Sequence, residues 1–112
     1  PVSVVLGVAI LESGSGTSRN CRQLNNHFGV TGKNHLKKRK SAYKQYANAE
    51  ESYRDFCNMV SRKKFYPKLK QNKNYKSWLT AMNHASYAGA KNVWITRITN
   101  IIVKNRLNQY DQ

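Results

Sequence analysis

Three stretches of the sequence place large apolar residues three and four positions apart, the spacing of one face of an α-helix. The stripes are Tyr53, Phe56, Cys57 and Val60; Tyr75, Trp78, Leu79 and Met82; and Trp94, Ile95, Ile98, Ile101 and Ile102. An apolar stripe has to be buried against another element. The pattern therefore predicts a mainly α fold, with helices that begin near Asn48, Asn74 and Asn92 and share one core.

The first of these helices has a clear start signal. Asn48 is placed to accept a hydrogen bond from the amide of Glu51, while the Glu51 carboxylate reaches back in a capping box. Glu50 and Glu51 also lie where the helix dipole favours negative charge. Asp55 lies one turn further on and is expected to pair with a basic neighbour, and Pro67 is expected to interrupt the chain after the helix.

The opening segment, residues 2–11, is ambiguous between helix and strand. Its β-branched residues favour a strand, whereas a leading proline and a stop that contains glycine suit a buried helix. The run Ser13-Gly14-Ser15-Gly16 ends either element. Thr17 or Ser18 then caps a short helix that runs to about Leu24.

Length and charge narrow the class of protein. A chain of 112 residues with 39% hydrophobic residues fits one packed domain, which we assign to residues 1–112. The formal charge of +15 attracts polyanions, and nucleic acid, acidic lipids and anionic wall polymers would all satisfy it. No nucleic-acid-binding motif and no apolar run long enough to span a membrane occurs. We expect a monomer.

Cys21 and Cys57 lie 36 positions apart without metal-ligand spacing, so we expect neither a metal site nor another cofactor. A single disulfide and two free thiols both remain open. The chain begins on Pro1 with an apolar segment close behind it. We interpret this as a trimmed N-terminus from which an export signal has been removed.

The least regular stretch, residues 33–46, is strongly basic. Lys33, Lys37, Lys38, Arg39 and Lys40 cluster there, with His35 between them. We predict a short basic loop or β-hairpin there. It would rim a cleft and meet acidic peptide stems, or it would be a solvated loop with no specific partner. Neither His27 nor His35 is expected to act as a catalytic base.

Glu12 is the acid whose position is hardest to explain by helix formation. It ends the most apolar segment of the chain, immediately before the Gly-rich turn. A carboxyl there is partly desolvated, which raises its pKa and keeps a proton available near neutral pH. A general acid in glycoside cleavage needs this property. The simpler alternative is a terminal helix glutamate that points into water.

Five motifs in order make the chain resemble the glucosaminidase family, glycoside hydrolase family 73. Residues 9–18, AILESGSGTS, resemble the family's A-x-L-E-S-G-x-G-x-S signature, and residues 25–30, NNHFGV, resemble N-N-x-F-G-I. Residues 43–46 with 50–55 resemble F-R-x-Y and E-E-S-x-x-D, residues 86–88 resemble G-Y-A, and residues 107–111 resemble L-x-x-Y-D. The resemblance covers nearly the whole chain from Val2 onward.

The resemblance implies a mainly α, lysozyme-like fold in which residues 2–11 form a helix. It implies an exported endo-β-N-acetylglucosaminidase that cleaves β-1,4 bonds in peptidoglycan. Glu12 matches the family's catalytic acid. Tyr87 matches a tyrosine of the cleft that orients the acetamido group or a water, unless it is an ordinary aromatic at the edge of the core. Asn26 and Phe28 match the segment beside the acid and are candidate substrate-binding residues, although Phe28 also suits packing.

The sequence departs from the family's pattern at the second acid. Many members carry one in the hairpin after N-N-x-F-G, but no Asp or Glu occurs here between Glu12 and Glu50. Gly89-Ala90 also replaces residues that are usually polar. The substrate's own acetamido group would then act as the nucleophile, or neutral groups such as Tyr87 would position a water. The third alternative is a wall-binding module without catalysis.

Overall fold

The computed structural model describes residues 1–34, 36, 42–84 and 91–111. The helices are α1 (Val2–Ser13), α2 (Arg19–Leu24), α3 (Ala49–Ser61), α4 (Tyr66–Leu69), α5 (Tyr75–His84), α6 (Lys91–Lys104) and the 3-10 helix η1 (Leu107–Tyr110). Within the described ranges there is no β-strand, and the helices form one small globule, so the mainly α prediction is confirmed. No described helix combines the length and apolarity needed to cross a membrane.

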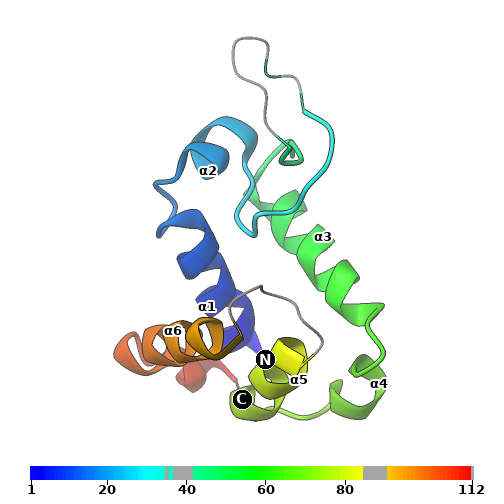
Figure 1. The fold of residues 1–112 in the computed structure, drawn as a ribbon, viewed down its shortest axis with the longest axis vertical. Coiled ribbons are helices and arrows are strands. Elements are labelled where there is room, and N and C mark those ends of the chain that lie inside the picture. The colour runs from blue at the N-terminus through cyan, green and yellow to red at the C-terminus, as the bar shows by residue number, and fades with distance from the viewer. Residues whose placement is uncertain (35, 37–41, 85–90, 112) are drawn as a thin grey trace.

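In the lower half of Figure 1, helices α5, α6 and η1 pack against helix α1. Helix α1 buries Val4, Val8 and Ala9. At Gly7 the helix approaches α6 so closely that an added Cβ would lie 3.2 Å from Ile98 Cγ2 and 3.3 Å from Ile102 Cγ1. Burial against these neighbours overrides the modest helix propensity of the β-branched residues, and the helical alternative for this segment is confirmed.

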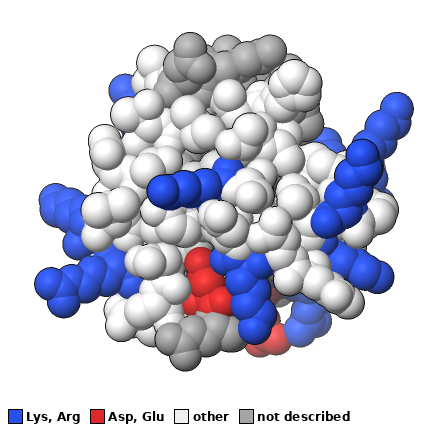
Figure 2. Space-filling model, turned by 90° about the horizontal axis from the view of Figure 1, so that it is seen from below, with Lys and Arg blue, Asp and Glu red and all other residues white. Residues whose placement is uncertain are grey.

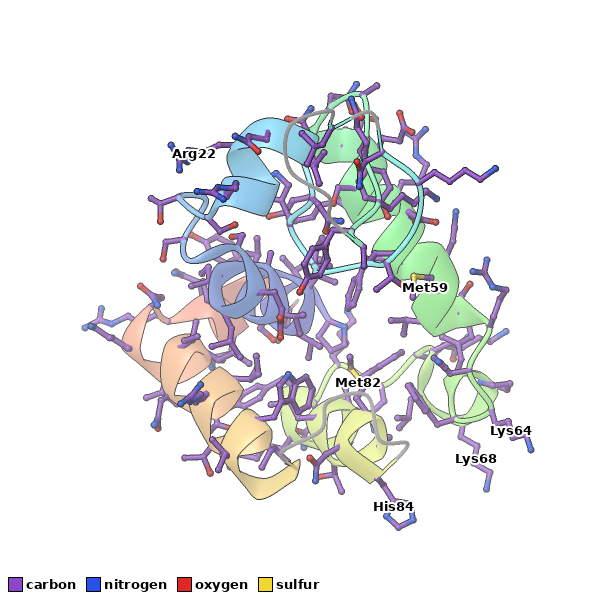
Figure 3. All side chains as sticks on the ribbon, turned by 45° about the horizontal axis from the view of Figure 1, so that its top comes forward. Arg22, Met59, Lys64, Lys68, Met82 and His84 are labelled. Atoms are coloured by element: carbon purple, nitrogen blue, oxygen red, sulfur yellow. The ribbon has the colours of Figure 1, made fainter. Side chains whose placement is uncertain are left out.

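The predicted apolar stripes supply the rest of the core. Its buried members from α3, α5 and α6 are Phe56, Trp78, Leu79, Met82, Trp94, Ile98 and Ile102. Figure 3 shows Met82 directed into the interior, whereas Arg22 points outward. Cys57 departs from the prediction, because it is exposed although it lies within the α3 stripe.

Most of the helix boundaries follow from local signals. Asn48 Oδ1 accepts from the Glu51 amide at 2.9 Å, but no hydrogen bond returns from the Glu51 carboxylate within the described residues, so half of the capping box forms. Ser18 Oγ accepts from the Cys21 amide at 3.2 Å, as a cap of α2 should. Pro67 does not simply interrupt the chain, because it lies in the first turn of α4, where its missing N–H is tolerated.

The two ends of the chain meet at the start of α1 (Figure 1). The Ser3 amide donates to Asp111 Oδ1 at 2.7 Å, and the Ser3 hydroxyl donates to Asp111 Oδ2. α1 has no acidic residue in its own first turn. Asp111 therefore supplies from the far end of the chain the negative charge that a helix N-terminus favours.

The basic stretch forms two extended arms joined by one antiparallel bridge, between Thr31 and Tyr43. The Gly32 amide donates to the Ala42 carbonyl, and the Lys44 amide donates to the Val30 carbonyl, each at 2.8 Å. Paired arms of this kind agree with the predicted loop or hairpin. Residues 35 and 37–41 lie outside the described part.

Candidate active site

Glu12 lies in the last turn of α1, just before the helix is stopped. Gly14 takes the left-handed conformation with φ +58°, and the Ser15 amide donates to the Ile10 carbonyl at 2.9 Å. These are the features of a glycine-terminated helix. The turn leaves the Glu12 carboxyl exposed at the end of the helix, where the dipole disfavours a negative charge.

The Glu12 carboxyl has neither a hydrogen bond nor an ion pair with any described residue. Partial desolvation at the end of α1 raises the pKa of this carboxyl above its ordinary value. The direction agrees with the expectation from the sequence. The group therefore holds its proton to a higher pH than a free glutamate would.

The other four acids of the chain all have structural roles. Glu50 pairs with Arg54 at 2.7 Å, and Glu51 lies beside it in the first turn of α3. Asp55 is bound by two side chains, described below, and Asp111 holds the start of α1. Among the described residues, the side chains of Glu12 and Glu51 have no hydrogen-bond or ion-pair partner, but the position of Glu51 in the first turn of α3 is favoured by the helix dipole, whereas the position of Glu12 in a last turn is not.

Gly29 lies directly against the Glu12 side chain. A Cβ added at Gly29 would lie 3.5 Å from Glu12 Oε2 and 4.0 Å from Tyr43 Cε1, and Gly29 has φ +70°, which disfavours other residues. Tyr43 is 38% exposed. The acid and an accessible aromatic ring thus both border the space that a side chain at Gly29 would occupy. Tyr43 was not among the predicted site residues, and its place in the F-R-x-Y motif was the available signal.

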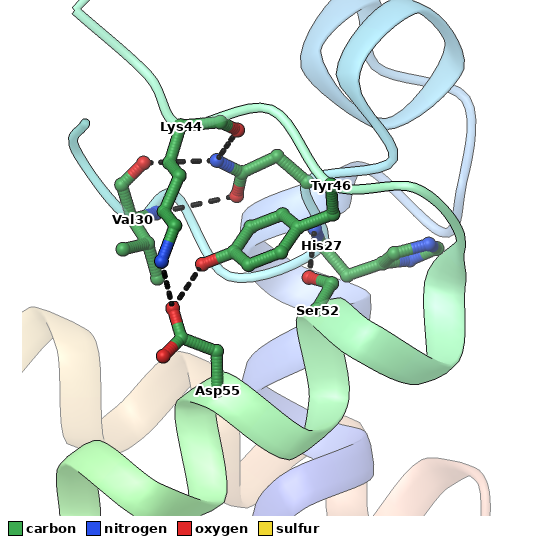
Figure 4. A network of polar contacts seen from close by, with 7 residues as sticks. His27, Val30, Lys44, Tyr46, Ser52 and Asp55 are labelled. Carbon is green, nitrogen blue, oxygen red and sulfur yellow. Dashed lines mark hydrogen bonds and ion pairs between the residues drawn. The ribbon is translucent and has the colours of Figure 1, made fainter. Parts of the chain in front are cut away.

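The turn at Gly29 is held by the buried amide of Asn26 (Figure 4). Asn26 Nδ2 donates to the carbonyls of Val30 at 2.9 Å and Lys44 at 2.8 Å. Asn26 Oδ1 accepts from the amides of Gly29 at 2.9 Å and Val30 at 3.2 Å. These four bonds use the full capacity of the side chain.

A second polar cluster ties the arms to α3 (Figure 4). Asp55 Oδ2 accepts from the Tyr46 hydroxyl and from Lys44 Nζ, the latter at 3.2 Å. The hydrogen bond from Tyr46, followed by that from Lys44, lowers the pKa of Asp55. Burial, followed by the Asp55 carboxylate, raises the pKa of Tyr46. The expected pairing of Asp55 with a basic neighbour is confirmed, and the cluster fixes the arm that carries Tyr43.

A family model described as Glucosaminidase, mannosyl-glycoprotein endo-beta-N-acetylglucosaminidase, matches residues 1–107. The chain belongs to the glucosaminidase family. The family's name is that of a glycoside hydrolase, which places the chain among glycan hydrolases at the level of the family. Comparisons with curated proteins and with solved structures found no match.

The residues of the different glucosaminidase motifs make different contacts in the structure. The N-N-x-F-G segment and the F-R-x-Y and E-E-S-x-x-D motifs build the loop and its attachment to α3, and the closing Y-D motif caps α1. Ser52 is part of the attachment, because its Oγ accepts from the His27 amide at 3.1 Å. The E-S-G motif presents the carboxyl of Glu12 at the end of α1, without a partner among the described residues.

The remaining predicted site residues have different surroundings. Asn26 is 1% exposed and fully engaged in its loop. Phe28 is 4% exposed and stacks on Phe56 with ring centroids 4.1 Å apart. Substrate binding by either residue stays a prediction, and direct contact would need the loop to open. Tyr87 lies outside the described residues.

Further titratable groups near the loop have no catalytic arrangement. Cys21 Sγ lies 3.3 Å from His27 Nδ1, and desolvation raises the pKa of the thiol and lowers that of the imidazole, so both are kept neutral. Cys21 and Cys57 are both free. The described residues contain no group of His, Cys, Asp and Glu that could hold a metal ion.

A hollow of about 640 Å³ follows the two arms. Its lining consists of Thr31, Gly32, Lys33, Lys44, Gln45, Tyr46 and Ala47. Glu12 is not part of this lining. Lys33 gives the hollow a positive charge with no ion-pair partner among the described residues, so the hollow suits an anionic group better than a neutral sugar.

Proposed function

We propose that this domain is a peptidoglycan hydrolase that cleaves β-1,4 bonds of N-acetylglucosamine, with Glu12 as the general acid. The observation that carries the proposal is the state of the Glu12 carboxyl. It is exposed, has no partner among the described residues and has a raised pKa, at the position where the family's signature places its acid. Family membership supports the reaction class, and the state of the carboxyl supports the choice of Glu12.

The chemistry proceeds with one protein carboxyl. Glu12 gives its proton to the glycosidic oxygen as the bond from that oxygen to the anomeric carbon breaks, and Glu12 becomes a carboxylate. The anomeric carbon is attacked either by the oxygen of the substrate's acetamido group or by a water molecule. In the acetamido route, the Glu12 carboxylate then takes a proton from the water that opens the cyclic intermediate, which restores the acid and completes hydrolysis. In the water route, the water attacks from the opposite face of the sugar and gives its proton to solvent, and Glu12 regains its proton from solvent.

Tyr43 is a candidate contact for the sugar ring in this proposal. An exposed aromatic ring next to the acid offers an apolar face on which a pyranose can pack, and its hydroxyl is a hydrogen-bond partner. Lys33 in the neighbouring hollow suits the carboxylates of the peptide stems. The domain acts in the cell envelope or outside the cell, as a monomer.

Replacement of Glu12 by Gln tests the assignment. We expect release of reducing ends from purified peptidoglycan to fall by about 10²- to 10⁴-fold, because Gln cannot protonate the leaving oxygen. Glu51→Gln is the matched control, since Glu51 is an exposed acid of α3 without a side-chain partner among the described residues, and it should keep native activity. Equal activity of the native and Glu12→Gln proteins would remove Glu12 from the mechanism.

A second function, binding of wall glycan without cleavage, is favoured by one observation. No Asp or Glu lies between Glu12 and Glu50 to act as a second carboxylate. This alternative predicts that sacculi bind both the native and Glu12→Gln proteins while no new chain ends form. Mass spectrometry of the digest decides between the two functions and reports which bond is cut.

The family description names a mannosyl-glycoprotein substrate, whereas the motifs resemble those of peptidoglycan hydrolases. Both substrates contain β-1,4-linked N-acetylglucosamine. An N-linked glycan of the high-mannose type should therefore be digested in parallel with peptidoglycan. Cleavage of the glycoprotein alone would contradict the proposed substrate and leave the role of Glu12 intact.

A further inference from the structure

The strongest local charge in the described part of the chain lies in residues 62–76, here called the basic segment. It connects α3 to α5 and contains α4. Seven of its residues are cations, namely Arg62, Lys63, Lys64, Lys68, Lys70, Lys73 and Lys76. The sequence has no Asp or Glu between Asp55 and Asp111, so no acid of the segment offsets this charge.

All seven cations are exposed, and none has an ion-pair partner among the described residues. Figure 3 shows Lys64 and Lys68 extending away from the body of the molecule beside α4. Figure 2 shows the end of the molecule on which α4 and α5 lie, with Lys and Arg side chains projecting on both sides and a small acidic area near the lower centre of the view. The segment therefore presents its charges to solvent.

The backbone of the basic segment is anchored to the core by aromatic side chains. The Trp78 indole N–H donates to the Asn72 carbonyl at 2.7 Å. The rings of Phe65 and Tyr66 each meet the Trp78 ring edge-on with centroids 6.1 Å apart. These contacts hold the cations on an ordered scaffold, so less conformational freedom is lost on binding than for a disordered basic tail.

The same contacts narrow the class of partner. Binding of single-stranded nucleic acid needs exposed rings on which bases stack, and insertion into a membrane interface needs exposed apolar side chains. The large apolar residues that are exposed in the described structure are Val2, Tyr43, Val93, Val103 and Tyr110. None of them belongs to the basic segment, which offers charge without stacking or insertion.

We propose that the basic segment docks the domain onto the anionic, phosphodiester-linked polymers of the cell wall. Seven unpaired ammonium and guanidinium groups match a flexible chain with one phosphate in each repeat, and binding would release its counterions. Docking would keep the enzyme bound to its insoluble substrate through successive cleavage reactions. The choice of a wall polymer over other polyanions depends on the proposed function, but docking itself does not need Glu12.

Two four-site variants test the location of the docking surface. One carries Lys63→Gln, Lys64→Gln, Lys68→Gln and Lys73→Gln. The matched control carries Arg19→Gln, Arg22→Gln, Arg97→Gln and Lys104→Gln, four exposed cations of α2 and α6, so both variants lose the same charge. Both are made in the Glu12→Gln background and checked for folding by circular dichroism. Co-sedimentation with purified sacculi is measured at several salt concentrations.

We expect the basic-segment variant to lose at least about tenfold in apparent affinity at 0.15 M salt and to show a shallower dependence on salt. The control should stay within about threefold of the parent. Sacculi from which the phosphodiester polymers have been extracted should bind the parent as weakly as intact sacculi bind the variant. Equal losses in both variants, or undiminished binding to extracted sacculi, would overturn the proposal.

Two further probes address the rival polyanions. The parent is titrated with a 20-base-pair DNA duplex and with vesicles that contain an anionic phospholipid, at equal phosphate concentration. Tighter binding to either probe than to intact sacculi would assign the surface to nucleic acid or to membrane and overturn the proposal. If instead docking holds while native protein releases no reducing ends, the proposed cleavage fails and the docking surface stands.

Discussion

Glu12 and Asp55 are both acids on helices, and their surroundings move their pKa values in opposite directions. Asp55 accepts hydrogen bonds from Tyr46 and Lys44, which stabilise its charged form. Glu12 lies at a helix C-terminus without a partner among the described residues, and partial desolvation stabilises its neutral form. The proton donor of the proposed site is thus defined by the contacts that it lacks.

The raised pKa of Glu12 predicts a dependence of stability on pH that is separate from activity. The folded state binds more protons than the unfolded state between the two pKa values, so the Glu12 contribution weakens as pH rises through the folded pKa. Glu12→Gln should therefore unfold at a higher temperature than the native protein at pH 7, and the difference should vanish near pH 3.5, below the ordinary pKa of about 4.3. Calorimetry at several pH values measures this. A lower midpoint for Glu12→Gln at pH 7 would contradict a desolvated carboxyl.

Asn26 illustrates how a motif residue can serve a site without facing it. Its buried amide fixes the backbone of Gly29 and Val30, and Gly29 lies against the Glu12 carboxyl. The predicted site residue therefore holds the backbone that lies against the acid, and its polar atoms bond to the loop. Sequence alone identified the residue and could not show which way its side chain points.

The position of α1 depends on elements that follow it by almost the whole chain. Asp111 binds the first turn of α1, and α6 packs against Gly7 in the middle of the helix. The end of α1, in contrast, is set locally by Gly14. Distant residues therefore hold the start and middle of the helix that carries the candidate acid, and a neighbouring glycine terminates it.

Asp111→Ala should destabilise the domain by about 1 kcal/mol, and at most about 2 kcal/mol, the range measured for loss of a helix N-cap. The reason is that the Ser3 amide and hydroxyl lose their acceptor. Gln109→Ala, an exposed position on η1, serves as the control and should change little. Denaturant unfolding measures both variants. If the two midpoints coincide, Asp111 does not cap α1 in solution.

At the scale of the whole molecule, charge opposes compaction. The chain carries 20 Lys and Arg against five Asp and Glu, and the ion pairs in the described residues involve only Lys44 and Arg54. Most of the positive charge is therefore unpaired and repels itself across a globule whose extents are 42 × 29 × 26 Å. The apolar core built on α1, α5 and α6 holds the chain together against this repulsion.

Added salt should therefore raise the thermal midpoint of the native protein between low ionic strength and 0.5 M NaCl. The Debye length shortens from about 30 Å at 0.01 M to well under about 10 Å, which screens repulsion between exposed cations. The variant with four Gln residues in the basic segment should show a smaller rise, because it carries less unpaired charge. A midpoint that falls with salt would show that attractive ion pairs dominate instead.

The sequence by itself determined the helices with apolar stripes, the cap at Asn48, the stop at Gly14 and the unusual position of Glu12. Each of these depends on residues within about one helical turn of one another, so the spacing along the chain encodes it directly. The family motifs extended this to the helical state of residues 2–11. That choice could not be made locally, because β-branched composition and helix-end signals disagree there.

Only the tertiary structure decided which residues meet across the chain. It placed Tyr43 and Gly29 beside Glu12, bound Asp55 to Tyr46, and joined Asp111 to Ser3 over 108 positions. Packing of the helices selects such contacts, and no local period records them. Glu12 could be identified from the sequence because its local context is unusual. The residues that surround it could be identified only from the folded structure, in which the loop packs against α1 and α3.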